Sequence, residues 1–234
     1  MLKLEHINAA YGQSPVLFDI NLEVNDAEAV TLIGRNGVGK TTLLRTITGL
    51  HPVTAGGVRL NGEQVEDQPA FVRARAGLAY VPQGRGLFSH LSVEENLLMG
   101  LPALAGRPTA KKQVPELVYD LFPICRDMAS RKAGNLSGGQ QQQVAIGRAL
   151  VTQPRYLLLD EPTEGIQPSI VQEIETALTR IRTELRVAVL LVEQYLDFAW
   201  AFADRYYVLQ RGRVVESGLT AEVPQSAVQN YMGV

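Results

Sequence analysis

Gly34-Arg35-Asn36-Gly37-Val38-Gly39-Lys40-Thr41 is the stretch that decides the fold of this chain. Two glycines that flank four residues and precede a lysine and a hydroxyl residue are typical of a phosphate-binding loop between a strand and a helix. Backbone N–H groups in such a loop point at a β-phosphate, and the positive end of the helix dipole adds to that attraction. We expect glycine at 37 and 39 because side chains there would block the approach. The loop predicts that the chain binds a nucleoside triphosphate.

The segments on either side of the loop support this prediction. Residues 28–33 form an apolar run that predicts a buried strand, and residues 41–47 have the periodicity of an amphipathic helix. Lys40 would bridge the β- and γ-phosphates as a mobile point charge, and the Thr41 hydroxyl would complete the shell of a Mg²⁺ ion. Thr42 would reach the α-phosphate, and Asn36 would also contact the nucleotide.

Composition indicates an ordinary globular protein of the cytoplasm. The chain has 234 residues, of which 46% are hydrophobic and 20% charged, and its net charge of -2 argues against a general nucleic-acid surface. The one cysteine, Cys125, cannot form an internal disulfide and is expected to be a small buried hydrophobe in a reducing compartment. Apolar runs such as residues 187–192 are too short to span a bilayer, and residues 1–6 predict a strand and not a signal peptide.

The order of predicted elements indicates an α/β protein with a phosphate-loop nucleoside triphosphatase (NTPase) core. Residues 2–8 and 16–24 alternate as antiparallel strands, and residues 58–60 followed by Asn61-Gly62 predict a hairpin. Strands and helices then alternate, which predicts a mostly parallel sheet behind an antiparallel N-terminal part. The later strands are expected at 78–81, 156–159, 187–192 and 206–209, and the later helices at 169–184 and 196–203.

A helical insertion is expected at residues 84–135, where the strand signal disappears. Residues 92–95 have the form of a capping box at the start of one of its helices, and residues 101–108 predict a turn in its middle. The run Gln140 to Gln143, at helical periodicity, is interpreted as a solvated helix face.

Two adjacent carboxylates end the strand at 156–159. Strand ends meet ligands in open α/β sheets, and neighbouring residues on a strand point in different directions, so Asp160 and Glu161 should do different work. We expect Asp160 to hold the Mg²⁺ shell and Glu161 to orient and deprotonate an attacking water.

A second glycine-bearing segment before a helix, Leu136-Ser137-Gly138-Gly139-Gln140, resembles the signature of ATP-binding cassette proteins. The resemblance covers residues 1–234 as one cassette and implies an ATP-hydrolysing subunit of a membrane transporter that uses ATP and Mg²⁺. It also implies that Tyr11 stacks on adenine and that Gln83 senses the γ-phosphate, the Mg²⁺ ion and the membrane partner.

The resemblance implies partners as well. Two cassettes pair head to tail, so that each ATP lies between the phosphate loop of one chain and Ser137, Gly138, Gly139 and Gln140 of the other. ATP then joins the two chains and hydrolysis releases them. A membrane permease would dock near Gln83 and the helical insertion, with Arg85 and Phe88 as docking residues, which places the chain on the inner face of the cell membrane.

Two departures from the family pattern concern the hydrolytic site. Most members place a histidine at the end of the strand after the carboxylates, but the three histidines here, His6, His51 and His90, all precede them. Gln194 stands at the matching position and cannot carry a charge near neutral pH, so we expect slow or partner-dependent turnover. The loop at 163–168 also lacks the aspartate that many relatives have there.

Within the family, the chain is similar to the branched-chain amino acid and amide uptake group. Its segment at 161–169 is most similar to that of the urea transporter ATPase. Such systems have two different cassettes, two permeases and a solute-binding protein, which predicts a heterodimer, with a homodimer as the alternative for the isolated chain. Import of urea is the expected function, and import of branched-chain amino acids is the alternative.

A function in DNA repair or chromosome maintenance is the alternative from another class. Such cassettes carry long coiled coils or extra domains between the two motifs, whereas only about a hundred residues separate Lys40 from Ser137 here. A nucleotide-binding regulator without turnover would be favoured by a missing carboxylate, but Glu161 is present.

Overall fold

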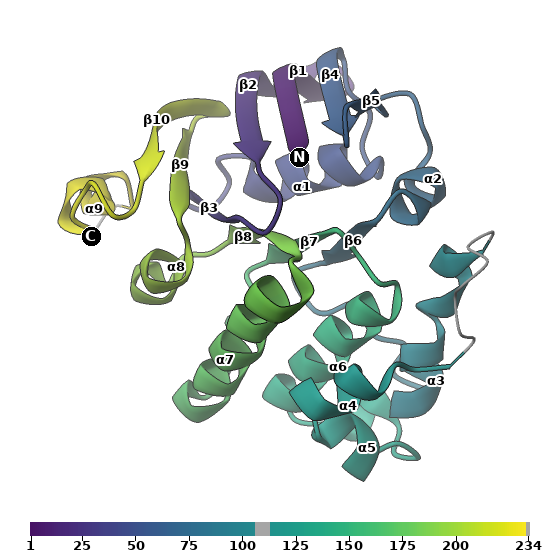
Figure 1. Cartoon of the computed structure of the whole chain (residues 1–234). Helices are drawn as coiled ribbons and strands as arrows, with labels where there is room; N and C mark the ends of the chain where they lie inside the picture. The colour runs from purple at the N-terminus through teal and green to yellow at the C-terminus, as the bar shows by residue number, and fades with distance from the viewer. Residues whose placement is uncertain (106–112, 233–234) are drawn as a thin grey trace.

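The computed structural model describes residues 1–105 and 113–232, and its strands form two sheets (Figure 1). The first sheet is antiparallel, because hairpins and a β1–β4 pairing join its strands. Its order is β2 (Ser14–Val24), β1 (Leu2–Tyr11), β4 (Ala55–Leu60) and β5 (Glu63–Gln64). The strands predicted at 2–8 and 16–24 and the hairpin at Asn61-Gly62 are therefore confirmed.

The second sheet carries the phosphate loop and the carboxylates. All of its neighbouring strands run parallel except β10, which pairs antiparallel with β9. Its order is β10 (Arg213–Leu219), β9 (Arg205–Gln210), β3 (Ala29–Ile33), β8 (Ala188–Val192), β7 (Tyr156–Asp160) and β6 (Leu78–Val81). The predicted mixed, mostly parallel α/β architecture is confirmed, although the sequence pattern did not indicate β10.

Both faces of the parallel sheet are covered, which explains the continuous apolar runs in its central strands. Every residue of β3, β7 and β8 is buried. One face, with Leu32, Leu158 and Leu190, shares a core with the antiparallel sheet and with α1 (Lys40–Thr48). The other face, with Leu159 and Leu191, packs in the core of α6 (Gly138–Val151) and α7 (Pro168–Leu185).

Helix α1 is held at its C-terminal end by a buried arginine. Arg73 belongs to α2 (Ala70–Arg75), a helix that the sequence pattern did not indicate, and is only 2% exposed. Its guanidinium donates hydrogen bonds of 2.7 to 3.0 Å to the carbonyl oxygens of Thr46, Ile47, Glu66 and Gln68. A cation against the last carbonyls of α1 complements the negative end of the helix dipole.

Several short helices lie between β6 and α6, and Figure 1 shows them gathered on one side of the molecule, away from the C-terminal end. They are α3 (Val93–Leu98), η1 (Leu101–Leu104), α4 (Glu116–Leu121), α5 (Ile124–Asp127) and η2 (Ala133–Asn135). Helices α3, α4 and α5 pack on α6, and Cys125 is fully buried among them. The capping box of Ser92 and Glu95 is confirmed by two reciprocal hydrogen bonds. Of the turn predicted at 101–108, residues 101–104 form the 3₁₀ helix η1 and 106–108 lie outside the described residues.

The glutamines at the start of α6 correct one prediction. Gln142 and Gln143 are buried, at 3% and 5% exposure, so this face of the helix is not solvated. The reason is the packing of α6 between the short helices and α7, where the Gln143 amide donates to Glu173 at 2.8 Å. A polar run at helical periodicity cannot show by itself that a second helix covers it.

The remaining helices are α7, α8 (Leu196–Phe202) and α9 (Ser226–Met232). The first two agree closely with the predicted helices at 169–184 and 196–203. Among the described residues, no helix combines the length and the apolar character that a membrane span requires.

Candidate active site

The phosphate loop leads from β3 into α1, and its glycines adopt a backbone that few other residues tolerate. Gly37 and Gly39 have φ values of +76° and +111°. A Cβ at Gly37 would extend into open space, in agreement with the expected ligand position, but a Cβ at Gly39 would lie 2.9 Å from the Leu17 side chain. Gly39 is therefore required by its conformation and by packing against β2, and the predicted reason, a blocked approach, is wrong for this glycine.

Lys40 lies folded over the loop. Its side chain is almost fully buried, and its ammonium donates to the carbonyl oxygens of Gly34 at 2.7 Å and Arg35 at 3.0 Å. The Glu161 carboxylate is 3.8 Å away. Burial lowers the pKa of Lys40, while the charges of Glu161, Asp160 and Glu193 act in the opposite direction. The ammonium is thus held where a phosphate in the loop would meet it.

Asp160 ends β7 inside the protein. It is 1% exposed, and its Oδ2 accepts a hydrogen bond of 3.1 Å from the Tyr80 hydroxyl. Burial raises the pKa of the Asp160 carboxyl, and burial likewise raises the pKa of Tyr80, which remains a donor. The Oδ1 atom is buried and has no hydrogen-bond partner among the described residues. An unpaired buried carboxylate oxygen is costly unless a cation or water meets it, so the donor set fits the Mg²⁺ ion expected at Thr41 and Asp160.

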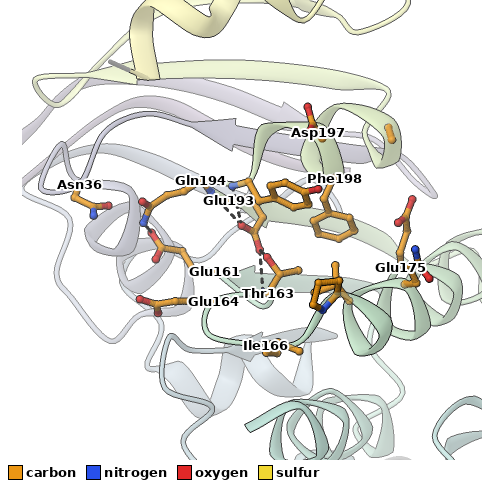
Figure 2. Close-up of a pocket in the computed structure, with 15 residues that line it drawn as sticks. Asn36, Glu161, Thr163, Glu164, Ile166, Glu175, Glu193, Gln194, Asp197 and Phe198 are labelled. Atoms are coloured by element: carbon orange, nitrogen blue, oxygen red, sulfur yellow. Dashed lines mark hydrogen bonds between the residues drawn. The ribbon is translucent and has the colours of Figure 1, made fainter. Parts of the chain in front are cut away.

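Glu161 points away from Asp160, into a different set of contacts. Its backbone has φ of +49°, a conformation uncommon outside glycine, and its N–H donates to the Val192 carbonyl oxygen at 2.8 Å. The Gln194 amide donates to Glu161 Oε1 at 2.7 Å and the Gln83 amide donates to Oε2 at 3.2 Å. Figure 2 shows Gln194 reaching toward Glu161 from the neighbouring strand end. Two amides from distant parts of the chain therefore orient one carboxylate.

Two cavities adjoin at this carboxylate. The one over the phosphate loop encloses about 280 Å³ and is lined by the predicted residues Tyr11, Asn36, Gly37, Gly39, Lys40, Thr41, Thr42, Gln83 and Glu161 together with Val16. The other encloses about 660 Å³ between the 161–168 loop, α7 and α8 (Figure 2). It shares Asn36 and Glu161 with the first and is also lined by Gln194. The fold thus brings together residues more than a hundred positions apart in the sequence.

Tyr11 stands at the rim of the smaller cavity with one face against a second ring. Its side chain is 48% exposed, and its ring centroid lies 4.2 Å from that of His51, at a tilt of 37°. His51 is only 8% exposed. Sequence reasoning considered His51 only as a histidine in the wrong place for the hydrolytic site, and no local pattern indicates that it supports Tyr11.

The signature segment lies apart from both cavities. Ser137 is the N-cap of α6: its hydroxyl accepts from the Gln140 N–H at 3.3 Å, and the Gln140 side chain accepts from the Ser137 N–H at 2.9 Å. Gly139 packs so closely on α7 that a Cβ would lie 2.7 Å from Ile170. Gly138 faces the Arg85 guanidinium. None of these four residues lines either of the two cavities beside Glu161, so their predicted contact with the nucleotide of a partner chain stays a prediction.

The two predicted docking residues differ in exposure. Phe88 is 49% exposed, and the side chain of the fully buried Asn96 binds its backbone N–H at 2.9 Å and its carbonyl oxygen at 3.0 Å. Arg85 is half-buried, and its guanidinium donates to Gln141 at 3.3 Å. The backbone of Phe88 is therefore held in place while its ring is exposed, whereas Arg85 is already engaged within the chain.

Comparison with known proteins agrees with this site. A family model described as "ABC transporter" matches residues 17–164, more than half of the chain. The chain is 43% identical to a high-affinity branched-chain amino acid transport ATP-binding protein, BraG, of Pseudomonas aeruginosa, over 92% of this chain and 91% of that protein. It is 37% identical to a probable branched-chain amino acid transport ATP-binding protein, LivF, of Archaeoglobus fulgidus, over 95% of this chain and 94% of that protein.

Solved structures share the fold over nearly the whole chain. A nucleotide-free ATP-binding cassette from an ABC transporter superposes with a TM-score of 0.83 at 26% identity, covering 100% of this chain and 95% of that one. A dimeric cassette in a post-hydrolysis state, bound to ADP and Pi, gives a TM-score of 0.82 at 27% identity, covering 94% and 99%. With its phosphate loop, buried carboxylates and capped signature helix, the chain belongs to the ATP-binding cassette transporter family and is an ATP hydrolase coupled to transport that uses ATP with Mg²⁺.

Proposed function

We propose that this chain is the ATPase subunit of an importer for branched-chain amino acids. The observation that carries the cargo assignment is the 43% identity to BraG over 92% of the chain, together with the match to LivF. The cargo itself would not contact this subunit, so the assignment rests on similarity to these relatives and not on the cavities.

Urea or another short amide is the second candidate cargo. It is favoured by the segment Glu161-Pro-Thr-Glu-Gly-Ile-Gln-Pro-Ser169, which is similar to that of the urea transporter ATPase. The two candidates share the same subunit chemistry and differ in the solute-binding protein and permeases that work with it.

The geometry supports a division of roles within the site. Lys40 would neutralise charge on the β- and γ-phosphates from its position over the loop, and Thr41 and Asp160 would hold Mg²⁺. When bound, the Mg²⁺ ion would supply positive charge that offsets the negative charge of the triphosphate. Glu161 would accept the proton of the attacking water. Exposed Tyr11 would stack on adenine, and Thr42 and Asn36 would contact the nucleotide from the cavity wall.

Gln194 is a neutral residue at the position where most members of the family have a histidine. Its amide donates to the carboxylate that would act as base, at 2.7 Å, and it stays neutral throughout the pH range in which a histidine would titrate. We therefore propose that turnover at this phosphate loop is slow in the isolated chain and depends on partners. Rapid hydrolysis by the purified chain alone would contradict this.

We also propose the proteins with which this subunit assembles. Ser137 and the glycines after it would complete the nucleotide site of a second cassette, in a heterodimer within the transporter or a homodimer of the isolated chain. Two permeases would dock near Gln83 and the exposed ring of Phe88, on the cytoplasmic face of the membrane, and a solute-binding protein would act through them.

The test is capture of the complete assembly. Tagged Glu161→Gln chain is bound to detergent-solubilised native membranes with Mg-ATP, and the recovered proteins are identified. Because this variant is expected to hydrolyse ATP too slowly to drive transport, the same proteins are reconstituted with the wild-type chain for uptake of leucine and urea. Recovery of two permeases and a second cassette, with leucine uptake, supports the proposal. Urea uptake without leucine uptake would replace the cargo assignment, and recovery of the chain alone or with nucleic-acid proteins would overturn the transporter function.

A further inference from the structure

Glu193 is a buried carboxylate beside the hydrolytic site that no sequence motif indicated. It follows the last residue of β8 and is 2% exposed. Its Oε1 accepts hydrogen bonds from the Thr163 backbone N–H at 3.0 Å and from the Thr163 hydroxyl at 2.8 Å. Its Oε2 accepts from the backbone N–H groups of Gln194 at 3.0 Å and Tyr195 at 3.3 Å. Figure 2 shows the carboxylate between Thr163 and the start of the segment that carries Gln194.

All of these partners act as donors, which requires an acceptor at both oxygens. An ionised carboxylate has acceptor sites only, so it satisfies the four hydrogen bonds without conflict. Burial raises the pKa of Glu193, while the hydrogen bonds from Thr163, Tyr195 and Gln194 act in the opposite direction. A buried charge of this kind is retained only where its partners are well placed.

The four hydrogen bonds join two loops that meet at Glu161. Thr163 lies in the loop between β7 and α7, two residues after Glu161, and Gln194 begins the loop between β8 and α8. The Gln194 amide returns to Glu161 Oε1 at 2.7 Å. The contacts therefore form a closed ring that runs from Glu161 through Thr163, Glu193 and Gln194 back to Glu161.

We propose that Glu193 is a positioning residue for ATP hydrolysis, which sets the direction of the Glu161 carboxylate through Gln194 and the Thr163 loop. The proposal rests on the proposed function in one respect, the role of Glu161 as base. Glu193 does not line the phosphate-loop cavity and, in the described part of the chain, forms no hydrogen bond to the predicted metal-binding residues Thr41, Gln83 and Asp160. Its loss should therefore affect the rate of hydrolysis and leave nucleotide binding in place.

Glutamine at position 193 is a sharp test because it keeps the shape and removes one acceptor. The amide nitrogen of a Glu193→Gln side chain must face either the Thr163 backbone N–H or the N–H groups of Gln194 and Tyr195, so that it meets a backbone donor that cannot accept. Either orientation removes at least one hydrogen bond of the ring. Glu175→Gln is the matched control, because Glu175 lines the same large cavity and undergoes the same chemical change outside the ring.

The experiment measures kcat and KM for ATP, together with fluorescent ATP-analogue affinity and Tm, in the complex with its partner cassette and permeases. We expect Glu193→Gln to lower kcat by ~10-fold, as is usual when a residue that orients a functional group is changed, with KM and affinity within about 2-fold. Glu175→Gln should match the wild type. In a Gln194→Ala background, Glu193→Gln should lower kcat by less than about 2-fold, because the two residues act in one chain of contacts.

Variants at Thr163 keep the test decisive if Glu193→Gln does not fold. Thr163→Val removes the hydroxyl and leaves the N–H, so kcat should fall less than in Glu193→Gln, and Thr163→Ser should restore it. An unchanged kcat in Glu193→Gln, or a loss fully additive with Gln194→Ala, would overturn the proposal. Glu161→Gln is measured in parallel: wild-type turnover in that variant would remove the base assignment itself, a failure distinct from that of Glu193.

Discussion

The two helices that begin at glycine-rich segments, α1 and α6, are built differently at their first turns. Helix α1 begins after Gly39 with no side-chain cap. It starts at the phosphate-loop cavity, and its first residue, Lys40, donates to a carbonyl oxygen of the loop. Helix α6 begins after Ser137, whose capping box with Gln140 satisfies the backbone N–H groups of both residues. The helix lines neither of the two cavities beside Glu161. Both have the positive end of a helix dipole, but α1 has no side-chain cap and carries Lys40 over its loop, whereas α6 is capped and the nearby Arg85 guanidinium already donates to Gln141.

This difference indicates an order of events. The start of α1 can bind a triphosphate within one chain, because the loop, Lys40 and the carboxylates are already assembled. The start of α6 has no charged side chain of its own in the capping box, and we expect it to add to a phosphate that another chain already holds. Nucleotide binding should therefore precede pairing, and changes on the two sides should have separable effects.

The largest effect is expected from Glu161→Gln, which removes the base and keeps the shape of the side chain. Hydrolysis should slow by at least ~10²-fold, because a general base typically contributes that much. ATP-bound dimers should accumulate and be visible by size-exclusion chromatography with light scattering. Adding Ser137→Ala should dissolve these dimers if α6 completes the site. Turnover at the wild-type rate would exclude Glu161 as the base.

Lys40→Ala should remove the charge with which the start of α1 is expected to bind a triphosphate. Loss of the ammonium should weaken ATP binding by the isolated chain by ~10²-fold, since a hydrogen bond to a charged group contributes about 1.5–3 kcal/mol. Titration of the isolated chain with a fluorescent ATP analogue measures this loss of affinity. Ser137→Ala should bind the analogue like the wild type in the same assay. Equal losses in the two variants would show that the starts of α1 and α6 are not functionally distinct.

Ser137→Ala should have a smaller effect on folding, and the chain provides its own control. Ser92 forms the same capping box with Glu95 at the start of α3. Each alanine variant should lower the free energy of unfolding by about 1 kcal/mol, measured by urea denaturation. Only Ser137→Ala should also lose ATP-dependent pairing. If Ser92→Ala loses pairing to the same degree, the effect reflects helix stability and not contact with nucleotide.

The smallest effect is expected at Cys125, behind α6. Burial raises the pKa of this thiol to about 12, so the reactive thiolate is nearly absent from the folded protein at pH 8. A thiol reagent should react only after urea unfolding, and saturating ATP should not change this protection, because the proposed nucleotide site lies at α1. Rapid labelling of the folded chain would show that α5 separates from α6 far more readily than this packing indicates.

The sequence predicted the parts of the fold and site that depend on local patterns. The loop at 34–41, the strand that ends in Asp160 and Glu161, and the capping box at Ser92 are set by neighbouring residues, and the structure places them as expected. The apolar runs identified the parallel strands for the same reason.

Contacts between distant segments were not visible in the sequence. Tyr80 reaches Asp160, and His51 supports Tyr11, because strand pairing brings those segments together. Glu193 depends on the register of β7 against β8, where Asp160 pairs with Val192 and the following residues of both strands meet. A parallel register is a property of the whole sheet, so no short motif records it.

Arg73 has a mechanical consequence for the transport cycle. Its guanidinium joins the end of α1 to the segment before α2 through carbonyl oxygens of four residues, and lysine, with three donors on a compact ammonium, cannot reproduce that planar arrangement. We expect a helix anchored in this way to resist sliding along its axis when a triphosphate binds at its other end. A displacement that drives transport would then have to occur outside α1.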